Sequence, residues 1–359
     1  MESLIISISD MSVKYHLYTI RHIREWLYND EQNGLSEDVI SKVRANAIAH
    51  NPYVDDNTLA VVVAKDDERL VGYTAMFPDC WARPKMVVSV ATTLWVDPDY
   101  ADEFVSYYLT QALRDNPIGN LIGADAAPAS VLVDKLLGLN ARMTYRSRYV
   151  MNRNLKVRSF RNFCSLLIEP FRLMKQRLAW RNVRIDEAVK VEYCNFIDKQ
   201  TYNFIEKHSD DDVLLRSHEM LNWIMQYPFA IDSPLIDNIT SQNRFRSNIE
   251  NRKNYFVKVF LKEMMIGFFS IYMSGKDAYL RMLYYEKGYE ERVSEVIMAH
   301  VGLLKPEVFR CHYVPVMDYV DKMNLALKKY KEEFSFTYPK TIGIDIDKRI
   351  QAIDGDMFA

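Results

Sequence analysis

A strand, a tight turn and a helix follow one another between Met86 and Leu113, and this unit constrains the fold more than any other stretch. Residues 86–96 are a long run of apolar, largely β-branched side chains, which predicts a buried strand. Asp97 then precedes a proline, which disfavours helical geometry, and Asp99 is suited to cap a helix. Helical spacing of apolar residues follows at Phe104, Val105, Tyr108, Leu109, Ala112 and Leu113. The N-terminus of such a helix offers unpaired N–H groups to a ligand.

The elements on either side complete a sheet with helices. Strands are predicted at residues 3–8, 59–64, 70–77, 118–124 and 144–151, and helices at residues 13–27, 36–50 and 129–137. Ser36 is the predicted cap of the second helix, and Gly138 is the predicted end of the third. This order predicts an α/β sandwich around one sheet.

The pattern then repeats. Residues 68–73 have a counterpart at residues 263–268, an offset of 195, and residues 95–100 have one at residues 284–289, an offset of 189. A third match joins residues 133–136 to residues 320–323 at an offset of 187. The matches keep their order, so a tandem duplication explains them, and chance similarity between two α/β domains is the alternative. A chain of 359 residues is also long enough for two domains of roughly 150 residues each.

The second copy has its own set of predicted elements. Helices are predicted around residues 186–207, 212–225, 290–304 and 316–326, and strands at residues 255–260, 265–273, 278–285, 308–313 and 334–338.

With this element order, the central strand–turn–helix resembles the centre of a GCN5-related N-acetyltransferase (GNAT) domain. The resemblance implies an α/β (α+β) fold of two tandem GNAT-like domains, residues 1–152 and 183–359, each a mixed, mostly antiparallel sheet flanked by helices. In that family acyl-coenzyme A lies where two neighbouring strands part, with its pyrophosphate on the helix N-terminus. The residues that the resemblance assigns to acetyl-CoA or another acyl-CoA are Leu94, Trp95, Val96, Ala101, Asp102, Glu103, Phe104 and Val105.

The phosphate-binding loop departs from the family pattern, Arg/Gln-x-x-Gly-x-Gly/Ala. Here the matching residues are 101–106, with Phe104 and Ser106 in place of the glycines and with Asp102 and Glu103 as added negative charge. Residues 290–295 of the second copy depart as far. Acids in a first helical turn stabilise the helix dipole by about 0.3–1 kcal/mol each, which is their alternative role.

GNAT chemistry is direct acyl transfer and needs a general base and donors that polarise the carbonyl. The predicted catalytic residues lie at strand ends: Asp97, Glu286 and His312, with Asp125 a further candidate. Turn capping is the alternative role of Asp97, and core packing is that of His312. The family's acid, a tyrosine in the penultimate helix, is matched by Asp134 and by Asp321, for which an ordinary solvated role is the alternative.

Composition narrows the class of partner. The net charge of −2 argues against a DNA-binding protein. The four cysteines are widely spaced with no CxxC pair, and no histidine spacing matches a metal site, so we expect a cytoplasmic protein with reduced thiols and no metal. The N-terminal residues carry no signal-peptide pattern.

The segment between the copies, residues 153–182, is basic and amphipathic. Such a helix either makes peripheral contact with an anionic membrane or packs between the domains with its basic face in water. Residues 216–223 further resemble a helix of bacterial GNAT-like proteins of surface-polysaccharide synthesis.

The predicted function is transfer of an acyl group from acyl-CoA to an amine or hydroxyl of a small molecule or sugar. Two alternatives stay open: an aminoacyl-tRNA-dependent transferase of the tandem-GNAT type, and a catalytically inactive GNAT-like binding or scaffold protein.

Overall fold

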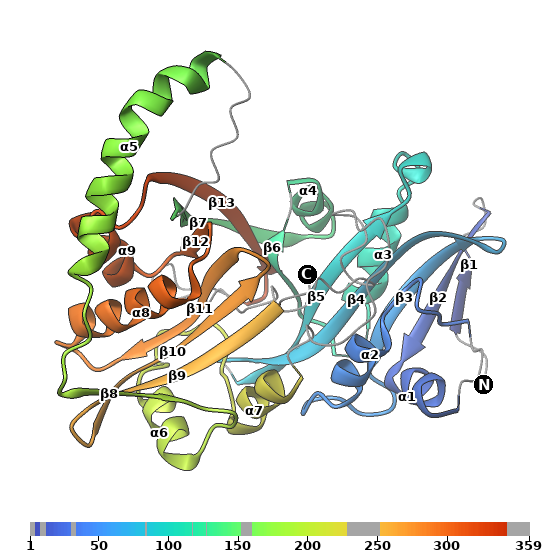
Figure 1. Cartoon of the computed structure of the whole chain (residues 1–359). Coiled ribbons are helices and arrows are strands. Elements are labelled where there is room, and N and C mark those ends of the chain that lie inside the picture. The colour runs from blue at the N-terminus through green and yellow to red at the C-terminus, as the bar shows by residue number, and fades with distance from the viewer. Residues whose placement is uncertain are drawn as a thin grey trace. The chain divides into compact units, whose positions relative to one another are not determined.

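The computed structural model describes residues 4–7, 12–29, 34–82, 85–116, 118–126, 128–151, 160–227 and 252–342. The chain packs as two units (Figure 1). The first unit takes residues 1–144, 211–250 and 334–359, and the second takes residues 145–210 and 251–333. The predicted linker at residues 153–182 therefore falls in the second unit. Two stretches of the predicted second copy, residues 211–250 and 334–359, group with the first unit.

The first unit is built on a mixed sheet in the order β1-β2-β3-β4-β5-β6-β13. Its strands are β1 (Leu4–Ser7), β2 (Val13–Thr19), β3 (Leu59–Asp66), β4 (Arg69–Trp81), β5 (Met86–Val96), β6 (Leu121–Ala126) and β13 (Lys328–Pro339). Residues 334–339 of β13 belong to this unit, and its first residues belong to the second. Neighbouring strands are antiparallel, and β5 and β6 form the parallel pair.

The helices of this unit are α1 (Ile20–Asn29), α2 (Lys42–Ala49), α3 (Val105–Arg114), α4 (Pro128–Leu136) and α7 (His218–Gln226). A 3₁₀ turn, Pro98–Tyr100, lies between β5 and α3. The Trp223 indole of α7 donates a hydrogen bond to the Ala47 carbonyl (2.8 Å). The Leu215 N–H donates to the Cys80 carbonyl (2.8 Å), which adds the segment before α7 to the edge of β4.

Two predictions for this unit are wrong. Residues 13–19 form a strand and not the start of a helix, because they pair in antiparallel register with β3, and tertiary pairing outweighs the helical spacing of a short apolar segment. The helix predicted at residues 36–50 is shorter, since the cap is Ser41, whose hydroxyl accepts from the Arg44 N–H, and not Ser36.

The second unit is built on a sheet in the order β7-β12-β11-β10-β9-β8. Its strands are β7 (Leu139–Val150), β8 (Val189–Tyr193), β9 (Arg252–Leu261), β10 (Met264–Ser274), β11 (Asp277–Tyr285) and β12 (Val308–Cys311). Its helices are α5 (Phe160–Arg181), α6 (Lys199–Lys207), α8 (Glu290–Leu304) and α9 (Val314–Lys322). The helix predicted around residues 186–207 is wrong in its first half, because Val189–Tyr193 pairs with β9 as a strand.

The duplication is present in the structure. The series β2-α1-α2-β3-β4-β5-α3-β6-α4-β7 has the same order as β8-α6-α7-β9-β10-β11-α8-β12-α9-β13. The last strand of each series pairs outside its own series: residues 147–150 of β7 pair with β12, and Ser335 and Thr337 of β13 pair with β6. Each sheet is thus completed by a strand from the other repeat.

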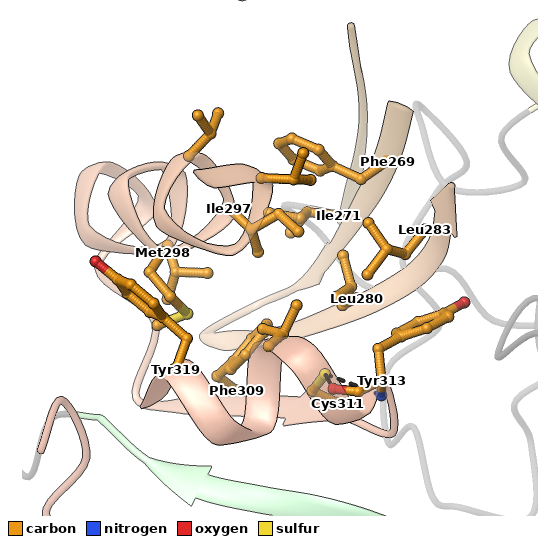
Figure 2. Packing of buried hydrophobic residues seen from close by; sticks show 14 of the residues in the cluster. Phe269, Ile271, Leu280, Leu283, Ile297, Met298, Phe309, Cys311, Tyr313 and Tyr319 are labelled. Atoms are coloured by element: carbon orange, nitrogen blue, oxygen red, sulfur yellow. Dashed lines mark hydrogen bonds between the residues drawn. The ribbon is translucent and has the colours of Figure 1, made fainter. Parts of the chain in front are cut away.

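Packing in the second unit shows why the helices lie where they do. Figure 2 shows side chains of β10, β11 and β12 pointing toward those of α8 and α9, including Phe269, Leu280, Ile297, Phe309 and Tyr319. All five are at least nine-tenths buried. Among the described residues, no helix is both long and apolar enough to cross a membrane.

Candidate active site

The candidate site of the first unit is the place where β5 and β6 part. Their parallel pairing runs from Ser89–Leu121 to Ala91–Gly123, and β5 then continues to Val96 without further recorded pairing to β6. On its other edge β6 pairs with β13, through Gly123 and Thr337. The register of β4 with β5 also shifts here, between Thr74 and Ala75, which places one extra residue on β5. A bulge of this kind bends a strand and redirects its side chains.

The second unit repeats this geometry. Parallel pairing of β11 with β12 runs from Asp277–Val308 to Tyr279–Arg310, and β11 continues to Tyr285. The register of β10 with β11 shifts between Ser270 and Ile271. Both units therefore have a bulged strand that continues beyond its parallel neighbour while staying paired with its antiparallel one, next to a helix N-terminus.

Asp134 of α4 is buried at the parting strands of the first unit. Its side chain accepts a hydrogen bond from the Thr337 hydroxyl (2.7 Å), and the residue is 7% exposed. Gly123 lies beside this pair, since a Cβ there would be 2.6 Å from the Thr337 Oγ1 and 3.5 Å from the Asp134 Oδ2. Burial raises the pKa of Asp134, and the hydrogen bond from Thr337 offsets part of that rise.

The equivalent aspartate of the second unit has different surroundings. Asp321 is exposed, and its carboxylate accepts from the Lys329 ammonium (2.6 Å). The two repeats have thus diverged at this position. A buried carboxyl with a raised pKa is a functional-site candidate. The first unit has one at this position, where the second unit has a surface ion pair.

A second polar group is buried near the parting strands. The Thr92 hydroxyl, directly after the last residue of β5 that pairs with β6, has no hydrogen-bond partner among the described residues, and Thr92 is 4% exposed. Leaving a buried hydroxyl unpaired costs about 1–3 kcal/mol. A bound polar group that formed a hydrogen bond with the Thr92 hydroxyl would remove this cost.

The residues predicted to hold acyl-CoA occupy two environments. Leu94, Trp95 and Val96 are half-buried at the end of β5, and the Trp95 ring stacks on Tyr73 with the ring centres 5.4 Å apart. Residues 101–104 are exposed, and Phe104, which caps α3 in the left-handed conformation with φ 55°, is 65% exposed. Val105 is fully buried and belongs to the core.

The predicted catalytic Asp97 lies in the turn between β5 and α3. Its carboxylate accepts from the Asp99 N–H (3.1 Å) and from the Arg69 guanidinium (2.9 Å), which also binds Asp99 (2.7 Å). The hydrogen bond from the Asp99 N–H, with Arg69 adding to it, lowers the pKa of Asp97. Asp97 therefore acts as a turn cap in this structure, and its lowered pKa makes it a weak proton acceptor.

The predicted catalytic Glu286 occupies the equivalent turn of the second unit. Its backbone N–H donates to the Ile266 carbonyl (2.9 Å), just as that of Asp97 donates to Val71 (2.8 Å). Its carboxylate accepts from Lys207 (2.8 Å) and lies 3.0 Å from the His208 Nε2. The hydrogen bond from Lys207, with His208 adding to it, lowers the pKa of Glu286.

The predicted catalytic His312 follows β12 directly, where β11 and β12 part. Its ring lies 4.1 Å from the ring centre of Tyr313, whose hydroxyl donates to the Arg281 carbonyl (2.8 Å). The Arg281 guanidinium is buried 3.8 Å above the Tyr272 ring. The structure thus gathers aromatic and cationic groups around His312. Asp97 belongs to the first unit, and Glu286 and His312 belong to the second. The side chain of Asp125 lies outside the described residues.

The turn before α3 is a poor cradle for a pyrophosphate. Exposed Asp99, Asp102 and Glu103 precede the helix, and Arg69, the cation of this turn, is already paired with Asp97 and Asp99. The first turn of α8 carries Glu290 and Glu291. These acids suit the helix dipole, but they repel a phosphate. The helix ends therefore do not fit the diphosphate of coenzyme A.

The burial of Asp134 was not predicted from the sequence. Its position matches that of the family's acid, which was the available signal, but its burial depends on Thr337, 203 residues away in the chain. Among the described residues, no cluster of histidine, cysteine, aspartate and glutamate is placed to hold a metal ion.

No protein-family model and no curated protein matches the chain. Among solved structures, it is similar to the N-myristoyltransferase of Saccharomyces cerevisiae with bound myristoyl-CoA (TM-score 0.53, 11% identity, covering 98% of this chain and 89% of that one). It is also similar to an acetyltransferase, described as putative, of Pyrococcus horikoshii (TM-score 0.51, 11% identity, covering 96% and 93%). A GCN5-related N-acetyltransferase of Kribbella flavida aligns with TM-score 0.43 and 14% identity, over 78% of this chain, which spans 59% of that one.

The class that these observations define is a fold class, the tandem GNAT-like fold. The repeated ten-element order, the parted strands in both units and the likeness to the first two structures over nearly the whole chain confirm the predicted tandem GNAT-like fold. At these identities the likeness concerns the fold alone.

Proposed function

We propose that the chain is an acyltransferase that moves an acyl group from a thioester, with acyl-CoA as donor, to an amine or hydroxyl of a small molecule or saccharide. The reaction takes place where β5 and β6 part in the first unit. The observation that carries this proposal is the buried carboxyl of Asp134, hydrogen-bonded to Thr337 beside Gly123. The asymmetry with exposed Asp321 supports the first unit as the active one.

In the reaction, the acceptor nitrogen or oxygen bonds to the thioester carbonyl carbon, and the carbon–sulfur bond breaks. The leaving thiolate must gain a proton, and the acceptor must lose one. A carboxyl with a raised pKa is suited to donate that proton to the thiolate, as general acid. The acceptor proton passes to solvent, because Asp97, with its lowered pKa, is a weak base.

The mode of donor binding follows from the charges. Because acids surround the N-terminus of α3, the affinity for acyl-CoA comes from the acyl and pantetheine portions along β5, and the diphosphate adds little. The yeast N-myristoyltransferase, which has a similar fold, holds myristoyl-CoA in its crystal structure. A long acyl chain is therefore included among the donors to be tested.

Calorimetric titration with acetyl-CoA, longer acyl-CoAs and acetyl-pantetheine tests this function. We expect binding of at least one acyl-CoA, and an acyl-pantetheine affinity within about tenfold of that of the same acyl-CoA, equivalent to about 1.4 kcal/mol. Thiol release with a panel of amines and sugars should then fall more than tenfold in Asp134→Asn but not in the matched control Asp321→Asn. Absence of both heat and thermal stabilisation at millimolar concentrations of every thioester would reject the proposal.

A second candidate function is a catalytically inactive GNAT-like binding protein, and the acidic turns before α3 and α8 favour it. This alternative predicts that no thioester binds. The aminoacyl-tRNA-dependent alternative predicts a retarded tRNA band in gel shift, which the net charge of −2 disfavours.

A further inference from the structure

Helix α5 has two faces of different character. On one face, the Gln176 amide donates to the carbonyls of Met151 (2.7 Å) and Leu325 (2.8 Å), and the Trp180 indole donates to the same Leu325 carbonyl (3.2 Å). Trp180 also packs over Gly302 of α8, where a Cβ would lie 2.9 Å from the indole ring. This face ties the helix to the core of the second unit.

The opposite face of α5 is an exposed apolar stripe, defined by Phe171, Met174 and Leu178. These side chains are 71%, 57% and 50% exposed. At about 100° per residue, they fall on one side of the helix, roughly opposite Gln176 and Trp180. In the sequence the same spacing continues back through Phe160, Phe163 and Leu167, whose side chains lie outside those described. Figure 1 shows the N-terminal half of α5 projecting clear of α8 and α9.

Basic residues border the apolar stripe on both sides. On the same helical projection, Arg172 and Lys175 lie on one side and Arg177 and Arg181 on the other. Residues 171–181 include no acid. An apolar stripe between two rows of cations is the pattern of a helix that lies in the surface of an anionic bilayer.

A basic pocket lies beside the stripe. It has a volume of about 450 Å³ and is lined by Arg172 and Lys175 of α5 and by Lys328 and Lys329 at the start of β13. All four residues belong to the second unit. None of its described lining residues is acidic, although Lys329 also pairs with Asp321. A pocket with this charge accommodates a phosphate group at the level where α5 would meet lipid headgroups.

We propose that α5 docks this protein on the surface of an anionic phospholipid bilayer. Phe171, Met174 and Leu178 insert among the acyl chains, Arg177 and Arg181 contact headgroups, and the pocket at Lys175 and Lys328 takes a headgroup phosphate. The apolar stripe supplies depth of insertion, and the cations supply the preference for anionic lipid. Docking is independent of the acyl transfer proposed above.

Co-sedimentation with vesicles tests the proposal, using phosphatidylcholine alone and phosphatidylcholine mixed with phosphatidylglycerol. Wild-type protein should sediment with the mixed vesicles, remain in solution with the neutral ones, and be released by high salt. The variant F171S/M174S/L178S should bind the mixed vesicles more than tenfold more weakly than wild type. The variant R177E/R181E should have an affinity for these vesicles that is at least tenfold lower. The matched control is Leu303→Ser on α8, which removes a leucine that is 72% exposed and should not change binding.

Three results would overturn the proposal. The first is wild-type protein that stays in solution with the mixed vesicles at low salt. The second is a triple serine variant, folded by its thermal transition, that sediments as the wild type does. The third is a wild-type dimer in vesicle-free buffer that becomes a monomer on triple substitution, since the stripe would then be covered by a second copy of the chain.

Discussion

Gly267 of β10 lies directly beneath Val293 in the first turn of α8, so closely that a Cβ on Gly267 would be 2.8 Å from the Val293 Cγ2. The first unit has the same relationship between Gly72 of β4 and Val105 of α3, with a distance of 3.1 Å to the Val105 Cγ1. In both units the glycine pairs with the last residue of the bulged strand, which is Val96 in β5 and Tyr285 in β11. The close approach brings the helix N-terminus to the end of the strand that parts from its neighbour.

Gly267→Ala should therefore destabilise the protein by about 1–3 kcal/mol, because the added methyl overpacks a contact between strand and helix. Val293→Ala alone should also destabilise, through a cavity. The double variant should lose less than the sum of the two, by at least 0.5 kcal/mol as a rough minimum, since each change compensates the other. Chemical denaturation of the four proteins measures this coupling, and strict additivity would contradict the packing described.

The buried ion pair between Arg216 and Asp79 is expected to hold the segment before α7 against β4. Both side chains are at most 2% exposed, and the Asp79 carboxylate also accepts from the Cys80 N–H (2.8 Å). Asp79→Ala should cost about 3–5 kcal/mol, because it leaves Arg216 buried without its counter-charge. Urea denaturation measures the loss, and Arg24→Ala, which removes an exposed pair with Asp56, is the control with an expected change near zero to about 1 kcal/mol. Equal losses in the two variants would show that the Arg216–Asp79 pair is not buried.

Stability should depend on pH through Asp134. Burial raises the pKa of this carboxyl in the folded state above its unfolded value, so the native state binds the proton more tightly. The stabilisation is complete below the unfolded pKa, about 3.9, and is lost as the pH rises through the folded value. Asp134→Asn should then raise the melting temperature relative to wild type at neutral pH more than at pH near 4. Scanning calorimetry across this range checks the sign, and a variant less stable than wild type only at neutral pH would contradict it.

Asp198 should show the opposite sign. It caps α6 by accepting from the Thr201 N–H (2.8 Å), and it pairs with the buried Lys258. Burial alone would raise the pKa of Asp198, but the hydrogen bonds from Lys258 and Thr201 outweigh it and hold the pKa at about 2. Its stabilising contribution is present above the unfolded pKa and is lost as the pH falls toward 2.

Asp198→Asn should consequently destabilise the protein at neutral pH, and the difference from wild type should shrink as the pH falls from about 4 to 2. Asparagine retains much of the cap, so the measured difference reports mainly on the charge pair with Lys258. Denaturation curves at several pH values provide the measurement. A difference that does not change with pH would rule out the charge pair as its source.

Local patterns in the sequence were enough to predict much of the fold. The run of β-branched residues at 86–96 and the spacing of apolar residues at 290–304 predicted β5 and α8, because long periodic segments have one secondary structure that buries their apolar side. The three matches in the same order, at offsets of 195, 189 and 187, predicted the tandem order. Residues 13–19 and 189–193 were missed because a short amphipathic segment becomes a strand only when a neighbouring edge, here β3 or β9, is present to pair with it.

The candidate site depended more on tertiary structure. The sequence by itself determined the two repeats and the acidic turns at the helix N-termini, since these follow from composition and order along the chain. Only the tertiary structure decided that Asp134 is buried against Thr337 while Asp321 is exposed, and that the stripe on α5 remains uncovered. The physical reason is that burial, and with it the pKa of a carboxyl, depends on which distant segment packs against a residue, and β13 reaches Asp134 from the far end of the chain.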